Sequence, residues 1–266
     1  IEAIDAETIY DVPNLMLREG LDKVVLKKLG LIAYRTPDLD SWNEFLRKFQ
    51  NPKAFVEIGL VGKYVELQDA YKSIIEAIGH AGAENEVKVN IHFIHSEELL
   101  PENVPGLLKG LQGIIVAPGF GDRGTEGKIE AIRYARDNKI PFFGICLGMQ
   151  MAVIEFARNI LQLKNANSTE MNPRTPHPVI DLMEDQKKVT EKGGTMRLGA
   201  WDCKLDKNSK AFVAYGKDFI SERHRHRFEY NNAYFERFTA AGLKATGVNP
   251  NTGLVEIVEI PEHPWF

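Results

Sequence analysis

The central part of the sequence alternates short apolar runs with segments of helical periodicity, and no other feature restricts the fold as strongly. Four runs rich in Val, Ile and Phe predict strands at 55–61, 87–94, 113–116 and 140–145. Segments with apolar residues at helical spacing follow these runs and predict helices or helix ends at 69–78, 106–111, 126–137 and 147–161. Short apolar strands that are each followed by a helix are typical of a parallel sheet with helices on both faces. The sequence therefore predicts an α/β fold with an open, mostly parallel, doubly wound sheet.

The segments on either side of this alternation carry weaker patterns. Residues 1–31 predict a short strand followed by a helix, which is too little to form a core alone. Residues 32–54 predict a Pro-containing connector with at most one helix, around 41–49. From about residue 196 to 260, alternating patterns and turn residues predict antiparallel strands added at an edge of the sheet.

The composition excludes several classes of protein. The 266 residues include 33 Lys and Arg against 37 Asp and Glu, a formal net charge of -4 that gives no support for nucleic-acid binding. No apolar run reaches the roughly 18 residues that a membrane-spanning helix needs. The two cysteines, Cys146 and Cys203, are far apart and form no CxxC spacing, so neither a disulfide framework nor a Cys-based metal site is expected. A reducing, cytoplasmic location fits this cysteine usage best.

Cys146 lies where a predicted strand ends and a predicted helix begins, with Gly144 and Gly148 two positions away on either side. In open parallel sheets, ligands bind at the carboxyl ends of the strands. Flanking glycines allow the sharp turn that exposes a nucleophile, as in the serine form of this motif. The positive end of the helix dipole favours a thiolate there. The alternative, a buried structural cysteine, does not explain the two flanking glycines, so the sequence favours a nucleophile.

A second Gly-rich turn, at 117–124, follows the predicted strand 113–116. Such a turn presents backbone N–H groups to an anion, although on its own it is more often only a turn. Pro118 has no N–H, so Gly119 is the natural donor. Together with the N–H of Leu147, Gly119 is expected to form an oxyanion hole beside Cys146.

The segment Gly-Ile-Cys-Leu-Gly-Met-Gln at 144–150 resembles the nucleophile segment of class I glutamine amidotransferases. Further segments narrow this resemblance to the CTP synthase family; they are 61–64, 69–73, 165–170, 193–199 and 222–229. The resemblance runs through the whole chain. It implies that 1–31 is the tail of a synthetase domain, 32–54 an interdomain linker and 55–266 a C-terminally incomplete glutamine amidotransferase domain.

The resemblance implies that Cys146 attacks L-glutamine and forms a γ-glutamyl thioester with release of ammonia. Gly119 and Leu147 would hold the oxyanion and contact glutamine, with Gln150, Glu170 and Arg227 as the other glutamine-binding residues. A carboxylate for the α-ammonium group and a guanidinium for the α-carboxylate are the physically expected pair.

The remaining implications concern partners. The ammonia would aminate UTP in a synthetase domain that uses ATP and Mg²⁺, so no cofactor and no metal are expected in this chain, which also lacks a GxxxxGK[ST] phosphate loop. The loop from Phe120 to Arg123 resembles a lid near an allosteric GTP site, which makes GTP a candidate ligand. Homotetramers of the full-length enzyme are implied through the synthetase domain, with no nucleic acid or membrane as partner.

The segment 223–227 alternates arginine and histidine and would otherwise suggest a basic patch. Strand alternation predicts Arg223, Arg225 and Arg227 on one face and the two histidines on the other. Recognition of a substrate carboxylate is the favoured interpretation of Arg227. Cys203 is expected on a strand, in a structural role.

One departure from the family pattern limits the expected activity. A cysteine hydrolase needs a general base and an orienting partner, which the family supplies from a His-Pro-Glu segment. Here His263-Pro264 continues as Trp265-Phe266, so we assign no catalytic His or Glu, and we expect the base beyond Phe266. Both ends of the sequence suggest a fragment that hydrolyses glutamine slowly or not at all. The alternatives are a non-catalytic glutamine-binding or regulatory module, or another cysteine hydrolase that would leave the longer matches unexplained.

Overall fold

The computed structural model describes residues 1–2, 5–32, 35, 37–182 and 196–266. Its contacts divide the chain into two compact units, the first made of Ile1–Val56 and Lys72–Asn90 and the second of Glu57–Tyr71 and Ile91–Phe266. The functional domain boundaries expected from the sequence, 1–31, 32–54 and 55–266, stay predictions.

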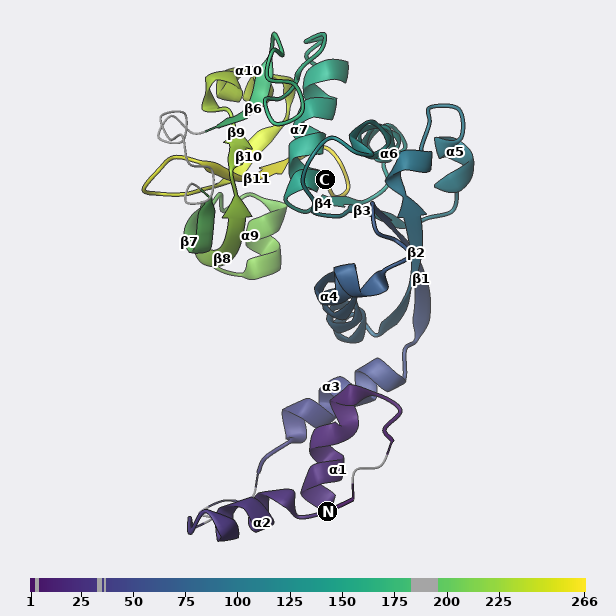
Figure 1. Ribbon diagram of the computed structural model, residues 1–266, viewed down its shortest axis with the longest axis vertical. Helices are drawn as coiled ribbons and strands as arrows, with labels where there is room; N and C mark the ends of the chain where they lie inside the picture. The colour runs from purple at the N-terminus through teal and green to yellow at the C-terminus, as the bar shows by residue number, and fades with distance from the viewer. Residues whose placement is uncertain (3–4, 33–34, 36, 183–195) are drawn as a thin grey trace. The chain divides into compact units, whose positions relative to one another are not determined.

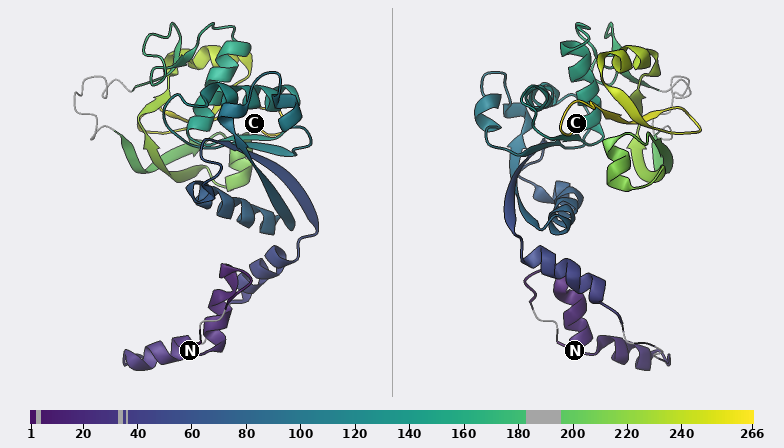
Figure 2. Two further views of the ribbon diagram at one scale, coloured as in Figure 1. Left: turned by 45° about the vertical axis from the view of Figure 1, so that its right-hand side comes forward. Right: turned by 180° about the vertical axis from the view of Figure 1, so that it is seen from behind.

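The first unit is mainly helical (Figure 2). Its helical elements are η1 (Ile9–Asp11), α1 (Val12–Arg18), α2 (Leu21–Lys28), α3 (Asp40–Gln50) and α4 (Lys72–Glu84). The short strand expected in residues 1–31 is absent from the described part of that segment. The reason is local, because the Thr8 side chain accepts a hydrogen bond from the N–H of Tyr10, and a proline occupies the first turn of α1. The helix expected around 41–49 is confirmed as α3.

A parallel sheet organises the start of the α/β region (Figure 1). Its strand order is β2-β1-β3-β4, with β1 (Ala54–Gly62), β2 (Val87–His95), β3 (Gly113–Val116) and β4 (Phe142–Gly144). Both β1 with β3 and β3 with β4 pair in parallel. Short helical turns join β1 to α4 and β2 to β3; they are η2 (Gln68–Tyr71), η3 (Ser96–Glu98) and α5 (Val104–Leu107).

Two helices of the second unit, α6 (Thr125–Asp137) and α7 (Leu147–Asn159), pack against β3, β4 and each other. Their apolar residues join those of β3 and β4 in one core cluster, with Ile132, Val153 and Ile154 fully excluded from solvent. This packing holds the carboxyl ends of β3 and β4 in place, which is where the candidate site lies.

Two further sheets contain the antiparallel strands, the first wholly antiparallel and the second mixed, since β5 pairs with β6 in parallel and β6 with β9 antiparallel. One has the order β11-β10-β7-β8, from β7 (Arg197–Leu205), β8 (Phe219–His226), β10 (Lys244–Val248) and β11 (Val255–Glu259). The other contains β5 (Asn167–Ser168), β6 (Pro178–Leu182) and β9 (Phe228–Tyr230). Figure 1 shows β7 and β8 side by side with α9 (Lys210–Tyr215) against them. The remaining helical elements are η5 (Asn232–Tyr234) and α10 (Phe235–Ala241).

The fold class is confirmed: a parallel sheet flanked by helices, with antiparallel strands in addition. The antiparallel strands differ from the expectation in forming separate sheets, because β7 pairs with β8 and β10 and not with the parallel strands. In the described part of the chain, no helix is long and apolar enough to cross a membrane.

Candidate active site

The backbone bends sharply at Cys146, which caps the N-terminus of α7 with φ 57° and ψ -106°. A left-handed φ is costly for a residue that carries a Cβ atom. The neighbouring glycines allow the bend, since a Cβ on Gly144 would lie 2.6 Å from the carbonyl carbon of Gly148. A Cβ on Gly148 would lie 2.3 Å from the carbonyl oxygen of Val116. The bend expected from the Gly-x-Cys-x-Gly spacing is therefore present.

Two backbone amides from separate segments converge on the sulfur atom. The N–H groups of Leu147 and Gly119 both hydrogen-bond Cys146. Burial raises the pKa of the Cys146 thiol, and the two N–H groups lower it by less, so the pKa lies above its ordinary value. The net direction corrects the expectation of a favoured thiolate, because desolvation outweighs the helix terminus. The same two donors are in place to hold an oxyanion.

A pocket of about 260 Å³ opens beside the sulfur. It brings together six of the residues that the sequence singled out: Gly119, Phe120, Cys146, Gln150, Glu170 and Arg227. Met196, Arg225, His226 and Phe228 complete its lining. Leu147 is buried and contributes its backbone N–H, whereas Arg123 does not line the pocket. A carboxylate and a guanidinium thus share one pocket with the thiol, as expected for binding an amino acid.

Side chains from distant parts of the sequence fix the walls of this pocket. The carboxylate of Glu170 accepts a hydrogen bond from the N–H of Gly121 at 2.8 Å, which ties it to the loop of Gly119. The amide of Gln150, on α7, donates to the carbonyl oxygen of Phe228 at 2.9 Å. That bond holds the chain next to Arg227.

Cys146 also lines a larger, mainly apolar cavity of about 510 Å³. His226 and Glu229 lie on its wall, with Nδ1 of His226 3.7 Å from a carboxylate oxygen of Glu229. Burial, aided by the charge of His224, lowers the pKa of His226 to about 4, so the ring is neutral at pH 7. Burial raises the pKa of Glu229 to about 7 despite the guanidinium beside it.

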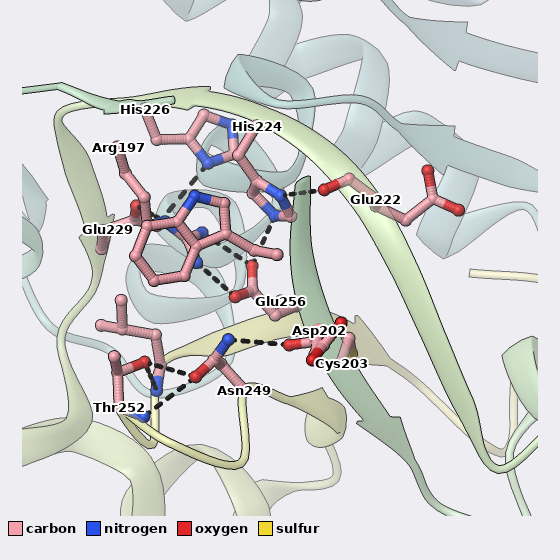
Figure 3. A network of polar contacts seen from close by, with 12 residues as sticks. Arg197, Asp202, Cys203, Glu222, His224, His226, Glu229, Asn249, Thr252 and Glu256 are labelled. Carbon is pink, nitrogen blue, oxygen red and sulfur yellow. Dashed lines mark hydrogen bonds and ion pairs between the residues drawn. The ribbon is translucent and has the colours of Figure 1, made fainter. Parts of the chain in front are cut away.

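A buried network of charges lies behind Glu229 (Figure 3). The guanidinium of Arg197 contacts Glu229 through Nε at 2.9 Å and Glu256 through both terminal nitrogens. His224 places Nδ1 2.9 Å from the carbonyl oxygen of Glu222 and Nε2 2.7 Å from the Glu256 carboxylate. Because both ring nitrogens face acceptors, His224 is favoured as the cation, and its pKa is raised, chiefly by the bond to Glu256.

The strand alternation expected around these histidines is present in β8. Arg223 and Arg225 are exposed, and His224 and His226 are half-buried. Arg227 follows the strand and is half-buried in the pocket wall. Cys203 lies on β7 with 1% of its surface exposed, and burial raises its pKa to about 12, which fits its expected structural role.

His263 is held away from the thiol. It is 2% exposed, its Nε2 lies 3.2 Å from the carbonyl oxygen of Ala135, and its Nδ1 accepts the N–H of Trp265. It lines neither cavity beside Cys146.

The expected lid residues carry exposed aromatic and cationic groups. Phe120 is 53% exposed, and the guanidinium of Arg225 lies 5.8 Å from the centre of its ring. Arg123 lies 5.4 Å from the ring centre of Tyr64 and pairs with Glu97 at 2.8 Å.

The burial of two lysines near Gly119 was not expected from the sequence. Lys63 follows β1 and Lys128 lies on α6; they are 5% and 0% exposed. A signal for Lys128 was present, because it shares the helix face of buried Ile132 and Ala135 at three- and four-residue spacing. A charged residue on an apolar helix face indicates that its charge is buried against a polar partner. The local sequence does not show which group that partner is.

In the described ranges, no group of three His, Cys, Asp or Glu side chains could hold a metal ion. Gly193, Gly194 and Thr195, which belong to one of the segments that carry the resemblance, lie outside the described residues.

Known proteins that are similar to this chain have the same class of domain that the site suggests. Residues 66–266 match the family described as glutamine amidotransferase class-I. The glutaminase domain of Trypanosoma brucei CTPS, solved with bound acivicin, superposes with a TM-score of 0.74 at 40% identity, covering 79% of this chain and 83% of that one. The chain therefore belongs to the class I glutamine amidotransferase family.

Within that family, its relatives are CTP synthases. The CTP synthase of Christiangramia forsetii is 66% identical over 266 residues, which is 100% of this chain and 49% of the relative. That of Bacteroides thetaiotaomicron is 55% identical over 268 residues, again 100% of this chain and 50% of the relative. The chain spans about half the length of the curated relatives it matches.

Proposed function

We propose that residues 55–266 form the glutaminase part of a CTP synthase, which hydrolyses L-glutamine to supply ammonia for the ATP-dependent amination of UTP to CTP. The observation that carries the proposal is the bend at Cys146, where the N–H groups of Gly119 and Leu147 meet the sulfur. A nucleophile beside two converging amides is suited to acyl transfer. The names of the relatives support the same reaction.

In the proposed reaction, the sulfur of Cys146 attacks the carbon of the glutamine side-chain amide. The tetrahedral oxyanion accepts hydrogen bonds from Gly119 and Leu147, and donors of this kind contribute about 3 kcal/mol each to lowering the barrier. The C–N bond then breaks, and the nitrogen leaves as ammonia after gaining the proton that the thiol gave up. Water hydrolyses the thioester to glutamate and restores the thiol.

We assign glutamine to the 260 Å³ pocket. Glu170 would bind the α-ammonium group and Arg227 the α-carboxylate, while Gln150 lines the pocket beside them. The acivicin bound to the T. brucei glutaminase domain supports a small-molecule site in this fold.

The rest of the reaction belongs to a synthetase portion. We propose that residues 1–31 are its tail and 32–54 the linker, and that ATP, Mg²⁺ and UTP bind outside residues 55–266. Relatives about twice as long support this division. Homotetramers and a cytoplasmic location are part of the same proposal, the latter supported by two free cysteines.

We further propose that GTP regulates this site through the lid residues Phe120 and Arg123. An exposed aromatic ring with guanidinium groups nearby suits a purine base and its phosphates.

Labelling with a diazo-ketone analogue of glutamine tests the assignment. We expect one adduct, on Cys146, that glutamine competes away and that Cys146→Ala abolishes, while buried Cys203 stays unlabelled. An adduct that persists in Cys146→Ala, located by mass spectrometry of the peptides, would refute the proposed nucleophile.

The rate of glutamine hydrolysis distinguishes an enzyme from a module that only binds glutamine. We expect residues 1–266 alone to release ammonia orders of magnitude more slowly than a chain that continues into a His-Pro-Glu segment, because loss of a triad base has that cost. Equal, negligible rates in both would favour the binding module.

A further inference from the structure

Two ammonium groups lie under the loop that carries Gly119, here called the oxyanion loop and defined as residues 117–121. Lys128 approaches from α6 and Lys63 from the end of β1, and both are almost fully excluded from solvent. Lysine is rarely buried this completely, because removing an ammonium group from water is costly unless polar partners replace the water. The hydrogen-bond partners of the two ammonium groups therefore indicate what the buried charges do.

The partners are carbonyl groups of the oxyanion loop. Nζ of Lys128 donates to the carbonyl oxygen of Ala117 at 3.1 Å. Nζ of Lys63 donates to the carbonyl oxygen of Phe120 at 2.6 Å and lies 3.4 Å from that of Gly121. The two lysines thus hold the loop from one side.

These bonds fix two peptide planes of the loop, one on each side of the pair of planes to which Gly119 belongs. The plane between Ala117 and Pro118 is held by Lys128. The plane between Phe120 and Gly121 is held at both ends, since its carbonyl accepts from Lys63 and its N–H donates to Glu170. Pro118 has no N–H, which leaves the N–H of Gly119 as the donor in the middle, directed at the sulfur.

Both lysine side chains also lie close to Gly119 itself. A Cβ built on Gly119 would lie 3.8 Å from Nζ of Lys128 and 4.0 Å from Cε of Lys63. Burial, with the charge of Lys63, lowers the pKa of Lys128 to about 8, and the ammonium favours the anionic form of Cys146. At pH 7 Lys128 remains mostly charged, and its field acts in a site of low dielectric constant.

We infer that Lys128 and Lys63 are positioning residues of the oxyanion loop, which aim the N–H of Gly119, and that Lys128 also places positive charge near the sulfur and the developing oxyanion. This inference rests on the proposed glutaminase function and adds two residues to its machinery. If the lysines were purely structural, they would only need to donate hydrogen bonds to the loop carbonyl groups. An effect of their charge on the reactivity of the Cys146 thiol therefore separates a positioning role from a purely structural one.

The test is the rate of Cys146 alkylation by iodoacetamide from about pH 6 to about pH 10, measured on the peptide that contains it. In Lys128→Met, which keeps much of the side-chain length and removes the charge, we expect alkylation at pH 7 to be slower by up to about tenfold, because less of the thiol is ionised. Above about pH 9 the rates should converge, because native Lys128 is then neutral. Lys128→Arg should stay within about threefold of the native rate at pH 7 and remain faster than Lys128→Met at high pH.

Other groups that face the thiol stay constant in this comparison. Glu229 faces it from β9, and the pocket wall adds Glu170, Arg225, His226 and Arg227. Lys210→Met is the matched control, since Lys210 also donates to backbone carbonyls, of Pro261 at 2.8 Å and Ile260 at 3.4 Å. We expect its alkylation profile to overlay that of the native chain.

An overlaid profile for Lys128→Met, in protein that still unfolds cooperatively, would overturn the inference. If Lys128→Met does not fold, Lys63→Met gives an independent answer: loss of its charge raises the pKa of Lys128, so reactivity assisted by Lys128 should persist to higher pH. An unmoved profile there would also overturn it. Because iodoacetamide needs no glutamine recognition, failure here is distinguishable from failure of diazo-ketone labelling.

Discussion

Individual glycines decide whether the thiol can be presented at all. The Gly148 position is the most restrictive at the bend, because an added methyl group would contact the Val116 carbonyl oxygen at 2.3 Å. That oxygen also accepts the N–H of Ile145 at 3.0 Å, so it cannot move without loss of a hydrogen bond. A substitution there tests the geometry of the bend separately from the chemistry of the sulfur.

We expect Gly148→Ala to lower the free energy of unfolding by about 2 kcal/mol or more, since overpacking forces the backbone to shift. Gly106→Ala is the control, because Gly106 is helical and a Cβ there has no neighbour within 4 Å. It should be neutral or slightly stabilising. Urea denaturation of both variants measures the difference; similar midpoints would show that the bend tolerates a side chain.

At the scale of secondary structure, buried charges join β7, β8, β9 and β11 near the site. Burial disfavours the charged form of Glu256, yet hydrogen bonds from Arg197 and His224 lower its pKa to about 2. A lowered pKa contributes stability that is present above the ordinary value of 4.5 and is lost as the pH falls toward 2. The raised pKa of His224 acts in the opposite direction, so its contribution is present below 6.5 and is lost at higher pH.

Glu256→Gln should therefore cost about 3 kcal/mol at pH 6, because it leaves a buried guanidinium with one carboxylate fewer. Between about pH 5 and pH 3 the native chain should lose stability faster than the variant. Glu126→Gln, which removes an exposed partner of Arg158, should change stability by less than about 1 kcal/mol. Parallel losses on acidification, measured by urea unfolding, would contradict the role given to Glu256.

The elements best predicted from sequence were those with local causes. The strand 113–116 has the expected bounds because its three apolar residues after Gly113 have no competing pattern, and the Cys146 bend followed from its two glycines. Helices 126–137 and 147–161 shifted by one or two residues at their ends. The burial of Lys128 and the bond from Gly121 to Glu170 were missed, because their causes are contacts between segments far apart in sequence. The separate antiparallel sheets were missed for the same reason.

At the scale of the whole molecule, the first unit contains an aromatic cluster around Tyr10. In the first unit, Tyr10 lies 5.3 Å from the ring of Phe45 and 5.4 Å from that of His80, and its hydroxyl hydrogen-bonds Glu76. The residues of the candidate site belong to the second unit. We therefore expect a defect in this aromatic cluster to leave the site intact.

We expect Tyr10→Ala to cost the first unit about 3 kcal/mol, the usual loss for a partly buried aromatic side chain. Amide hydrogen exchange should accelerate in α3 and α4 and stay unchanged in α6 and α7. The alkylation rate of Cys146 serves as the internal control. Equal acceleration in all four helices would mean that the two units unfold together.

The dihedral angles at Cys146 affect which substitutions evolution can accept at this position. Glycine adopts this conformation without strain, so replacing the cysteine by glycine would relieve the backbone while ending any thiol chemistry. Selection for stability and selection for turnover therefore oppose each other at this one position. A cysteine is therefore expected at such a bend only where thiol chemistry compensates for the strained backbone.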